Sequence, residues 1–132
     1  MEKPTILLVE DDDAVRLLVR RILGRGDFEL LEAENGFEAL RRAEEHGREV
    51  DLLLSDVAMP GMSGAELAQR LRQQHPSLAV LFMSGYFDQE TVRTPIREGR
   101  EWFIEKPFTP DELADRVAAV LAARGTSPED GS

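Results

Sequence analysis

Cysteine is absent from this chain of 132 residues, which excludes both disulfide bonds and thiolate metal sites. Long apolar runs are absent too, and the N-terminal residues 1–4 have no secretory pattern, so we expect a cytoplasmic protein without membrane contact. Positive charge is scarce, because 16 Lys and Arg stand against 26 Asp and Glu, a formal net charge of −10. Such an acidic surface repels phosphate backbones, so we expect no binding to nucleic acid.

Short apolar runs alternate with amphipathic stretches along the whole chain, a pattern typical of an α/β domain with a parallel sheet. The chain length suits one domain, predicted over residues 1–123. The Gly-, Ser- and acid-rich residues 124–132 are expected to form a disordered tail. Strands are predicted at residues 5–9, 28–33, 51–55, 79–83 and 102–105, and helices at residues 13–24, 36–46, 64–74 and 110–123.

Three details of these elements are further expectations. A fourth helix within residues 88–100 should be short or irregular, because Pro95 would break a continuous helix. His46 and His75 end helices beside Gly47 and Pro76 and are expected at the surface rather than as ligands. The buried stripe of the first helix is predicted from its apolar spacing to be Val15, Leu18, Val19, Ile22 and Leu23.

Polar residues stand where the predicted strands end. Glu10 and Asp11 directly follow the first strand, Asp56 the third, Ser84 the fourth and Lys106 the fifth. Parallel strands point the same way, so these groups should converge at the edge of the sheet where doubly wound proteins place their sites. Three carboxylates, a hydroxyl and an ammonium predict a site for a hard divalent cation and a phosphoryl group.

Each of these residues also has an ordinary structural explanation. Asp56 before Met-Pro-Gly could be a turn residue, Lys106 a solvated lysine, Ser84 a loop hydroxyl and Phe103 a core residue. Asp12 and Asp13, like Glu10 and Asp11 taken alone, suit the start of a helix. The conjunction of Glu10, Asp11, Asp56 and Lys106 favours the functional interpretation, and it supports Ser84 and Phe103 less.

Four motifs in the order of the predicted elements resemble the receiver domain of two-component response regulators. They are Val9-Glu10-Asp11-Asp12, the run Leu54 to Gly64, Met83-Ser84-Gly85 and Glu105-Lys106-Pro107-Phe108. The resemblance covers residues 5–123 and implies a flavodoxin-like, doubly wound sheet of strand order 2-1-3-4-5. Residues 83–86 and 103–108 are also similar to receivers at the ends of hybrid histidine kinases.

The resemblance implies a role for each site residue. Asp56 would accept a phosphoryl group from a phosphohistidine, and a carboxylate ionised at neutral pH needs no general base for this. Asp11 would bind Mg²⁺ or Mn²⁺ directly, together with Asp56 and the Ala58 backbone carbonyl. Glu10 stands where many members have Asp, and its extra methylene leaves open whether it contacts the metal directly or through water. Lys106 would contact a phosphoryl oxygen.

The same resemblance implies a conformational switch and two kinds of partner. Ser84 would donate to the phosphoryl oxygen after Asp56 is modified, and Phe103 would turn inward in response. The Lys106–Pro107 peptide bond is expected to be cis, and Tyr86 is expected to shield the aspartyl phosphate from water. The phosphodonor would be a histidine kinase or a phosphotransfer domain. A downstream protein would bind through the face near the fourth helix and the fifth strand.

Two other functions remain open at this stage. One is a receiver-like module that binds partners without phosphorylation, against which the intact acid pair, Asp56 and Lys106 argue. The other is a small Mg²⁺-dependent phosphohydrolase, for which no second acid near Asp56 is evident in the sequence. The chain is expected to be a signalling domain rather than an enzyme. It would be either a free-standing regulator or a receiver from a longer protein, such as a hybrid kinase.

Overall fold

The structure, a computed structural model, describes residues 3–84 and 101–124. The expected fourth helix, Tyr86 and the expected tail from residue 125 onward lie outside these residues. The strands are β1 (Thr5–Val9), β2 (Glu29–Ala33), β3 (Leu52–Asp56), β4 (Ala79–Ser84) and β5 (Glu101–Glu105). The helices are α1 (Asp13–Leu23), α2 (Gly36–His46), α3 (Gly64–Arg72) and α5 (Pro110–Arg124).

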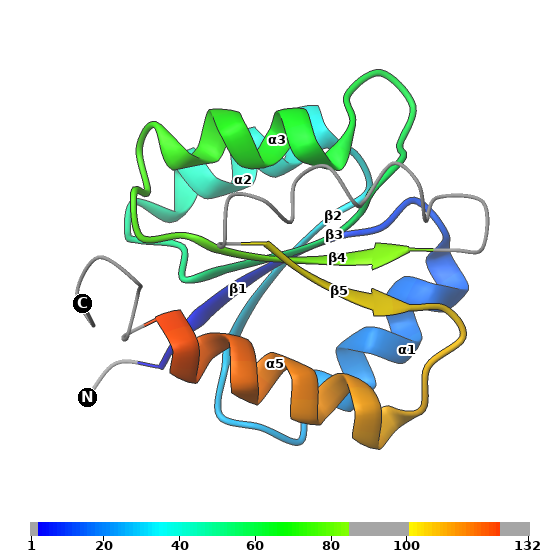
Figure 1. The fold of residues 1–132 in the computed structure, drawn as a ribbon. Helices are drawn as coiled ribbons and strands as arrows, with labels where there is room; N and C mark the ends of the chain where they lie inside the picture. Colours follow the sequence, from blue (N-terminus) through cyan, green and yellow to red (C-terminus); the bar gives the residue numbers. More distant parts are fainter. Residues whose placement is uncertain (1–2, 85–100, 125–132) are drawn as a thin grey trace.

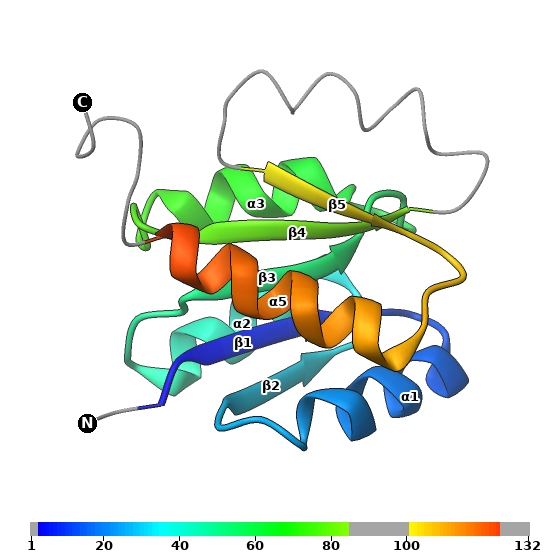
Figure 2. The ribbon, with the colours of Figure 1, turned by 60° about the horizontal axis from the view of Figure 1, so that its bottom comes forward.

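The five strands form one sheet in the order β2-β1-β3-β4-β5, and every neighbouring pair is parallel. Helices cover both faces, with α2 and α3 on one side and α1 and α5 on the other (Figure 1). The second view shows α1 and α5 lying along the same face of the sheet (Figure 2). This is the flavodoxin-like, doubly wound arrangement, so the predicted fold class and strand order are confirmed.

The sheet divides the core into two apolar layers because successive strand residues point to opposite faces. Leu7, Val9 and Leu53 belong to the layer under α2 and α3. Ile6 and Leu8 belong to the layer under α1 and α5. Both faces are buried at the central strands β1, β3 and β4, which explains their continuous apolar runs. The edge strands β2 and β5 are less buried and include glutamates.

Polar side chains begin the helices at the predicted places. The Asp12 carboxylate accepts from the backbone N–H groups of Ala14 and Val15 at the start of α1. Asn35 and Ser63 cap α2 and α3 by accepting from a backbone N–H three residues later, over 2.8 Å and 3.1 Å. These contacts satisfy donors that a helix leaves unpaired in its first turn. Capping therefore marks where α1, α2 and α3 begin after their preceding strands.

The predicted stripe of α1 is wrong at Leu18. Val19, Ile22 and Leu23 are buried, whereas Leu18 is 46% exposed and its neighbour Leu17 is 36% exposed. Each residue turns an α-helix by about 100°, so Leu18 lies at the rim of the face that Val19 presents to the sheet. Apolar spacing identifies the side of the helix that is buried but does not determine where the buried face ends.

The prediction that both histidines lie at the surface is also wrong. The His46 side chain is 8% exposed, and its Nε2 lies 3.3 Å from the Thr5 hydroxyl. His75 is 8% exposed, and its Nδ1 accepts from the Val50 N–H over 3.2 Å. Burial lowers the pKa of His75, which favours the neutral ring that can accept this bond. Both rings lie between the end of a helix and the chain entering a strand, which chain position alone did not indicate.

Within the ranges 3–84 and 101–124, no helix is both long and apolar enough to cross a membrane.

Candidate functional site

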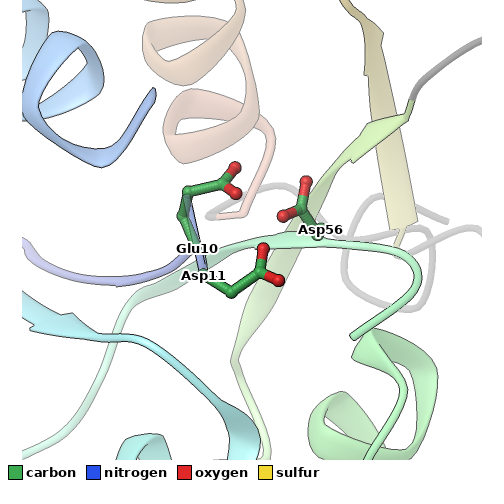
Figure 3. A group of neighbouring side chains, drawn as sticks. All are labelled: Glu10, Asp11 and Asp56. Carbon is green, nitrogen blue, oxygen red and sulfur yellow. The ribbon is translucent and has the colours of Figure 1, made fainter. Parts of the chain in front are cut away.

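Three carboxylates meet at the carboxyl edge of the sheet. Glu10 and Asp11 follow β1 directly, and Asp56 is the last residue of the neighbouring strand β3, where Val9 pairs with Ser55. One oxygen from each of the three carboxylates lies within 4.8 Å of the others. The side chains converge from two strand ends (Figure 3). The structure therefore brings together the acids that the sequence predicted as a cation site.

Glu10 is the buried member of this group, with an exposure of 1%. Its backbone N–H donates to the Ala33 carbonyl over 3.1 Å, which extends the pairing of β1 with β2 by one residue. Its Oε2 accepts from the Asp12 N–H over 3.1 Å, and its Oε1 accepts from Lys106 Nζ over the same distance. Burial raises the pKa of Glu10, and the neighbouring Asp56 carboxylate raises it further. Both oxygens of Glu10 are therefore already engaged by the protein.

Asp11 has the opposite environment, because its side chain is exposed. It borders a shallow cavity of about 370 Å³, whose other lining residues are Glu34, Asn35, Phe37 and Pro60. Phe37 is 59% exposed, and its ring packs over Gly61 in the loop after β3. Among the three acids, Asp11 is thus the carboxylate that an entering ion can reach with the least rearrangement.

Lys106 places its ammonium between two of the acids. Its Nζ donates to Asp56 Oδ1 over 2.6 Å and to Glu10 Oε1 over 3.1 Å. Its backbone N–H donates to the Ser84 carbonyl over 2.8 Å, which aligns it with the end of β4. The Lys106–Pro107 peptide bond is cis, as predicted. Burial alone would lower the pKa of Lys106, but the hydrogen bonds and charges of Asp56 and Glu10 outweigh it and raise the pKa.

Ser84 and Phe103 are the two residues with predicted switch roles. Ser84 lies on β4, the strand next to that of Asp56, and Phe103 lies on β5, one strand further along the sheet. Ser84 is the last residue of β4 and is 1% exposed. Phe103 lies in the middle of β5, and its ring stacks on that of Phe82 with the centroids 5.4 Å apart. Phe103 is half-buried, and the contact places it on the α2–α3 side of the sheet. The prediction that it turns inward on phosphorylation stays a prediction.

Gly64 contributes to the site in a way that the local sequence did not reveal. A Cβ added to this residue would lie 2.2 Å from the Asp56 carbonyl oxygen and 3.0 Å from the Phe82 ring. Its N–H donates to the Val57 carbonyl over 2.8 Å. Only glycine permits this approach, so the start of α3 packs directly against the backbone of Asp56. The sequence signal was only a glycine among the turn residues 59–64.

The donor set fits a hard divalent cation. Carboxylate oxygens are the ligands that Mg²⁺ and Mn²⁺ take from proteins, and the described residues offer three of them with one readily reached from solvent. Ala58 is exposed two residues after Asp56, between the buried Val57 and Met59. Its backbone carbonyl stays the predicted fourth protein ligand.

A doubly wound parallel sheet with an acid pair after β1, an aspartate ending β3 and a lysine after β5 defines a receiver domain. Comparison with known proteins agrees, because the model of the response regulator receiver domain family matches residues 6–118. The chain therefore belongs to this family of two-component signalling proteins.

Relatives and solved structures with this domain are diverse. The chain is 42% identical to the sensor kinase CckA of Brucella abortus over 117 residues, which are 89% of the chain and 12% of the kinase. It is 32% identical to the DNA-binding transcriptional regulator NtrC of Escherichia coli over 122 residues, 92% of the chain and 26% of that regulator. The structure of NtrX from Brucella abortus matches with a TM-score of 0.83 and 32% identity, over 95% of this chain and 28% of NtrX. The chain thus spans less than a third of each of these proteins.

Glu10→Gln is expected to raise the midpoint of thermal unfolding without metal at about pH 7.5, and to raise it less at about pH 5. The pKa of Glu10 in the folded protein lies above its ordinary value of 4.5, so its contribution to stability is fully present below that value. This contribution is lost as the pH rises through the folded-state pKa, because the ionised group is then buried beside Asp56. Glutamine cannot ionise and avoids this loss.

Melting curves of the variant and the wild type at both pH values test this prediction. Glu44→Gln, which removes the charge of an exposed glutamate on α2, is the matched control and should change the melting midpoint less than Glu10→Gln does. A variant that melts below the wild type at both pH values would contradict the assigned direction.

Proposed function

We propose that the chain is a phosphorylatable receiver. In this proposal Asp56 takes a phosphoryl group from the phosphohistidine of a histidine kinase or of a phosphotransfer domain. The observation that supports it most strongly is the meeting of Glu10, Asp11 and Asp56 with the ammonium of Lys106 at one sheet edge. Three acids and a base from three distant parts of the chain form no helix cap or surface ion pair of the ordinary kind. The three carboxylates suit a divalent cation, and the ammonium suits an anionic phosphoryl group bound beside that cation.

The chemical step is a transfer between two nucleophiles. A carboxylate oxygen of Asp56 forms a bond to phosphorus while the bond from phosphorus to the imidazole nitrogen breaks, and the imidazole takes up a proton. The obstacle is repulsion between two anions. Lys106 opposes this repulsion with a positive charge already 2.6 Å from Asp56 Oδ1. Mg²⁺, held by Asp11 and Asp56 with Glu10 and the Ala58 carbonyl, would neutralise and orient the phosphoryl oxygens.

We propose that the response passes through Ser84 and Phe103. The phosphoryl group adds a charge of about −1.5 to −2 beside Lys106 and requires new donors. The Ser84 hydroxyl at the end of β4 would supply one, and Lys106 another. Packing supports a connection to β5, because the backbone of Asp56 and the ring of Phe82 both pack against Gly64, and Phe103 stacks on Phe82. A shift at Asp56 would therefore act on the packing of Phe103.

The partners follow from this role. Phosphohistidine is made by kinases that use cytoplasmic ATP, so we place the chain in the cytoplasm. A downstream protein would bind beside β5, where the described residues form an open groove of about 770 Å³. The groove is lined by Phe103, Ile104, Glu105, Pro107, Glu112, Asp115 and Arg116. The part of this face that the fourth helix would form lies outside the described residues.

Incubation with Mg²⁺ and a small phosphodonor such as phosphoramidate, followed by intact mass measurement, tests the function. A receiver gains one phosphoryl group, and omission of Mg²⁺ prevents the gain. No adduct would support a module that acts without phosphorylation. Continuous release of phosphate over many turnovers would support a phosphohydrolase.

Lys106→Ala is expected to tighten Mg²⁺ binding by a few-fold while it uncouples phosphorylation from the conformational response. The ammonium holds one oxygen each of Asp56 and Glu10, so its removal leaves more negative charge for a metal ion. Calorimetric titration with Mg²⁺ measures the affinity. Amide NMR spectra with and without phosphodonor measure the response. Weaker Mg²⁺ binding in a variant that is still folded would contradict the placement of Lys106 in the pocket.

A further inference from the structure

Arg16 lies behind the acid pair, in the first turns of α1, and its side chain is 20% exposed. Its Nη1 donates to the backbone carbonyl of Glu10 over 2.7 Å, and its Nη2 donates to the Asp13 carboxylate. Its Nε lies 3.8 Å from Glu32 Oε1 on β2. One guanidinium thus joins the loop after β1, the start of α1 and the second strand.

The contact with the Glu10 carbonyl acts on Asp11. The peptide unit is planar, so the atom that holds the carbonyl oxygen of Glu10 also sets the direction of the Asp11 N–H and Cα. The other side of the loop is held as well, since Asp12 caps α1 and its carbonyl accepts from the Arg16 N–H over 2.9 Å. Between these fixed points Asp11 presents its carboxylate to Asp56.

From this geometry we infer that Arg16 is a positioning residue for the cation site, a role that rests on the function proposed above. It orients the Glu10–Asp11 peptide so that the Asp11 carboxylate meets that of Asp56. The rigid fork of a guanidinium suits this task, because it can hold a carbonyl and two carboxylates without rearrangement. Lysine offers a single ammonium and cannot reproduce the three contacts.

The charge of Arg16 and its positioning role predict opposite changes in Mg²⁺ affinity when Arg16 is lost. A positive charge beside a cation site repels the cation, so its removal should tighten Mg²⁺ binding if Arg16 acts only through its field. If Arg16 acts by positioning, its removal should weaken Mg²⁺ binding, as the loss of residues that orient metal ligands does in other proteins. The direction of the change therefore separates the two explanations.

The chain contains a matched control in Arg20, one turn further along α1. Arg20 pairs with the same residue, Glu32, over 3.4 Å and carries the same charge, but this contact is made to β2 and not to the loop after β1. Calorimetric titration with Mg²⁺ measures the affinity and so separates positioning from charge. It is carried out on the wild type, Arg16→Ala, Arg16→Lys and Arg20→Ala. All titrations are run well below the unfolding midpoint of every variant.

Arg16→Ala is expected to weaken Mg²⁺ binding by about tenfold, Arg16→Lys to weaken it less, and Arg20→Ala to leave it unchanged or slightly tighter. The amide NMR signal of Asp11 without metal should move in Arg16→Ala and stay in place in Arg20→Ala. If Arg16→Ala does not fold, Arg16→Lys decides by the same two measurements.

Unchanged or tighter Mg²⁺ binding in the Arg16 variant that folds would overturn this inference alone, because Mg²⁺ binding by the wild type would still stand. A lower melting midpoint with unchanged affinity would assign Arg16 a purely structural role and overturn the inference equally. Absence of Mg²⁺ binding by the wild type would overturn the proposed function, and this inference with it.

Discussion

Asp56→Asn is expected to abolish phosphorylation while leaving the fold intact. The amide nitrogen and oxygen of asparagine are too weakly nucleophilic to attack phosphorus, whereas a carboxylate is ionised and ready at neutral pH. The shape of the side chain is retained, and its oxygen can still accept from Lys106 Nζ, which lies 2.6 Å from Asp56 Oδ1 in the wild type. Intact mass after incubation with Mg²⁺ and phosphoramidate should show no adduct.

The matched control for this variant is Asp12→Asn. It removes the same charge close to the site, and asparagine caps a helix as well as aspartate does, so labelling should persist. An adduct on Asp56→Asn, located by peptide mapping at another residue, would refute the assignment of the phosphoacceptor. Because one of three converging negative charges is removed, the melting midpoint of Asp56→Asn without metal should not fall below that of the wild type.

Asp11→Ala is expected to abolish Mg²⁺-dependent phosphorylation, and Glu10→Ala to reduce it less. The environments of the two acids explain the difference. Asp11 is exposed beside an open cavity, whereas both oxygens of Glu10 already accept hydrogen bonds, from Asp12 and Lys106. We therefore expect Asp11 to bind the metal directly and Glu10 through water. The dissociation constant for Mg²⁺ should rise at least about tenfold in Asp11→Ala, equivalent to about 1.4 kcal/mol.

Labelling rates measured over a series of Mg²⁺ concentrations separate the two variants. A lost ligand raises the concentration of Mg²⁺ needed for half the maximal rate, whereas a general loss of structure lowers the rate at every concentration. Glu34→Ala, which removes an exposed acid bordering the same cavity as Asp11, serves as the control for charge. If Glu10→Ala proves the more damaging change, Glu10 is the direct ligand and the assignment must be reversed.

Local signals in the sequence were sufficient to predict the alternating strands and helices and the meeting of Glu10, Asp11, Asp56 and Lys106 at one sheet edge. Alternation of apolar runs with amphipathic stretches indicates a parallel α/β sheet, and capping residues such as Asp12 and Asn35 locate helix starts closely. Parallel strands then require that residues ending different strands share one edge, which brings Asp56 and Lys106 together. The strand order came only through the resemblance to receivers.

Contacts between distant segments were decided by the tertiary structure. Spacing along a helix did not show that Leu18 lies beyond the buried rim, and chain position did not show that His46 and His75 fill gaps between elements. The sequence placed Glu10 and Asp11 side by side as equivalent acids. Packing made them different, since one is buried against Lys106 and the other faces solvent.

Two contacts at the site were also decided by the tertiary structure alone. Gly64 allows α3 to approach the Asp56 carbonyl, and Arg16 reaches back from α1 to the Glu10 carbonyl. In both cases the partner is a backbone oxygen. Every residue possesses one, so the sequence does not indicate which oxygen will be contacted. Side-chain chemistry at strand ends can therefore be anticipated from the order of residues. The backbone geometry that aims those side chains is set only when the helices pack onto the sheet.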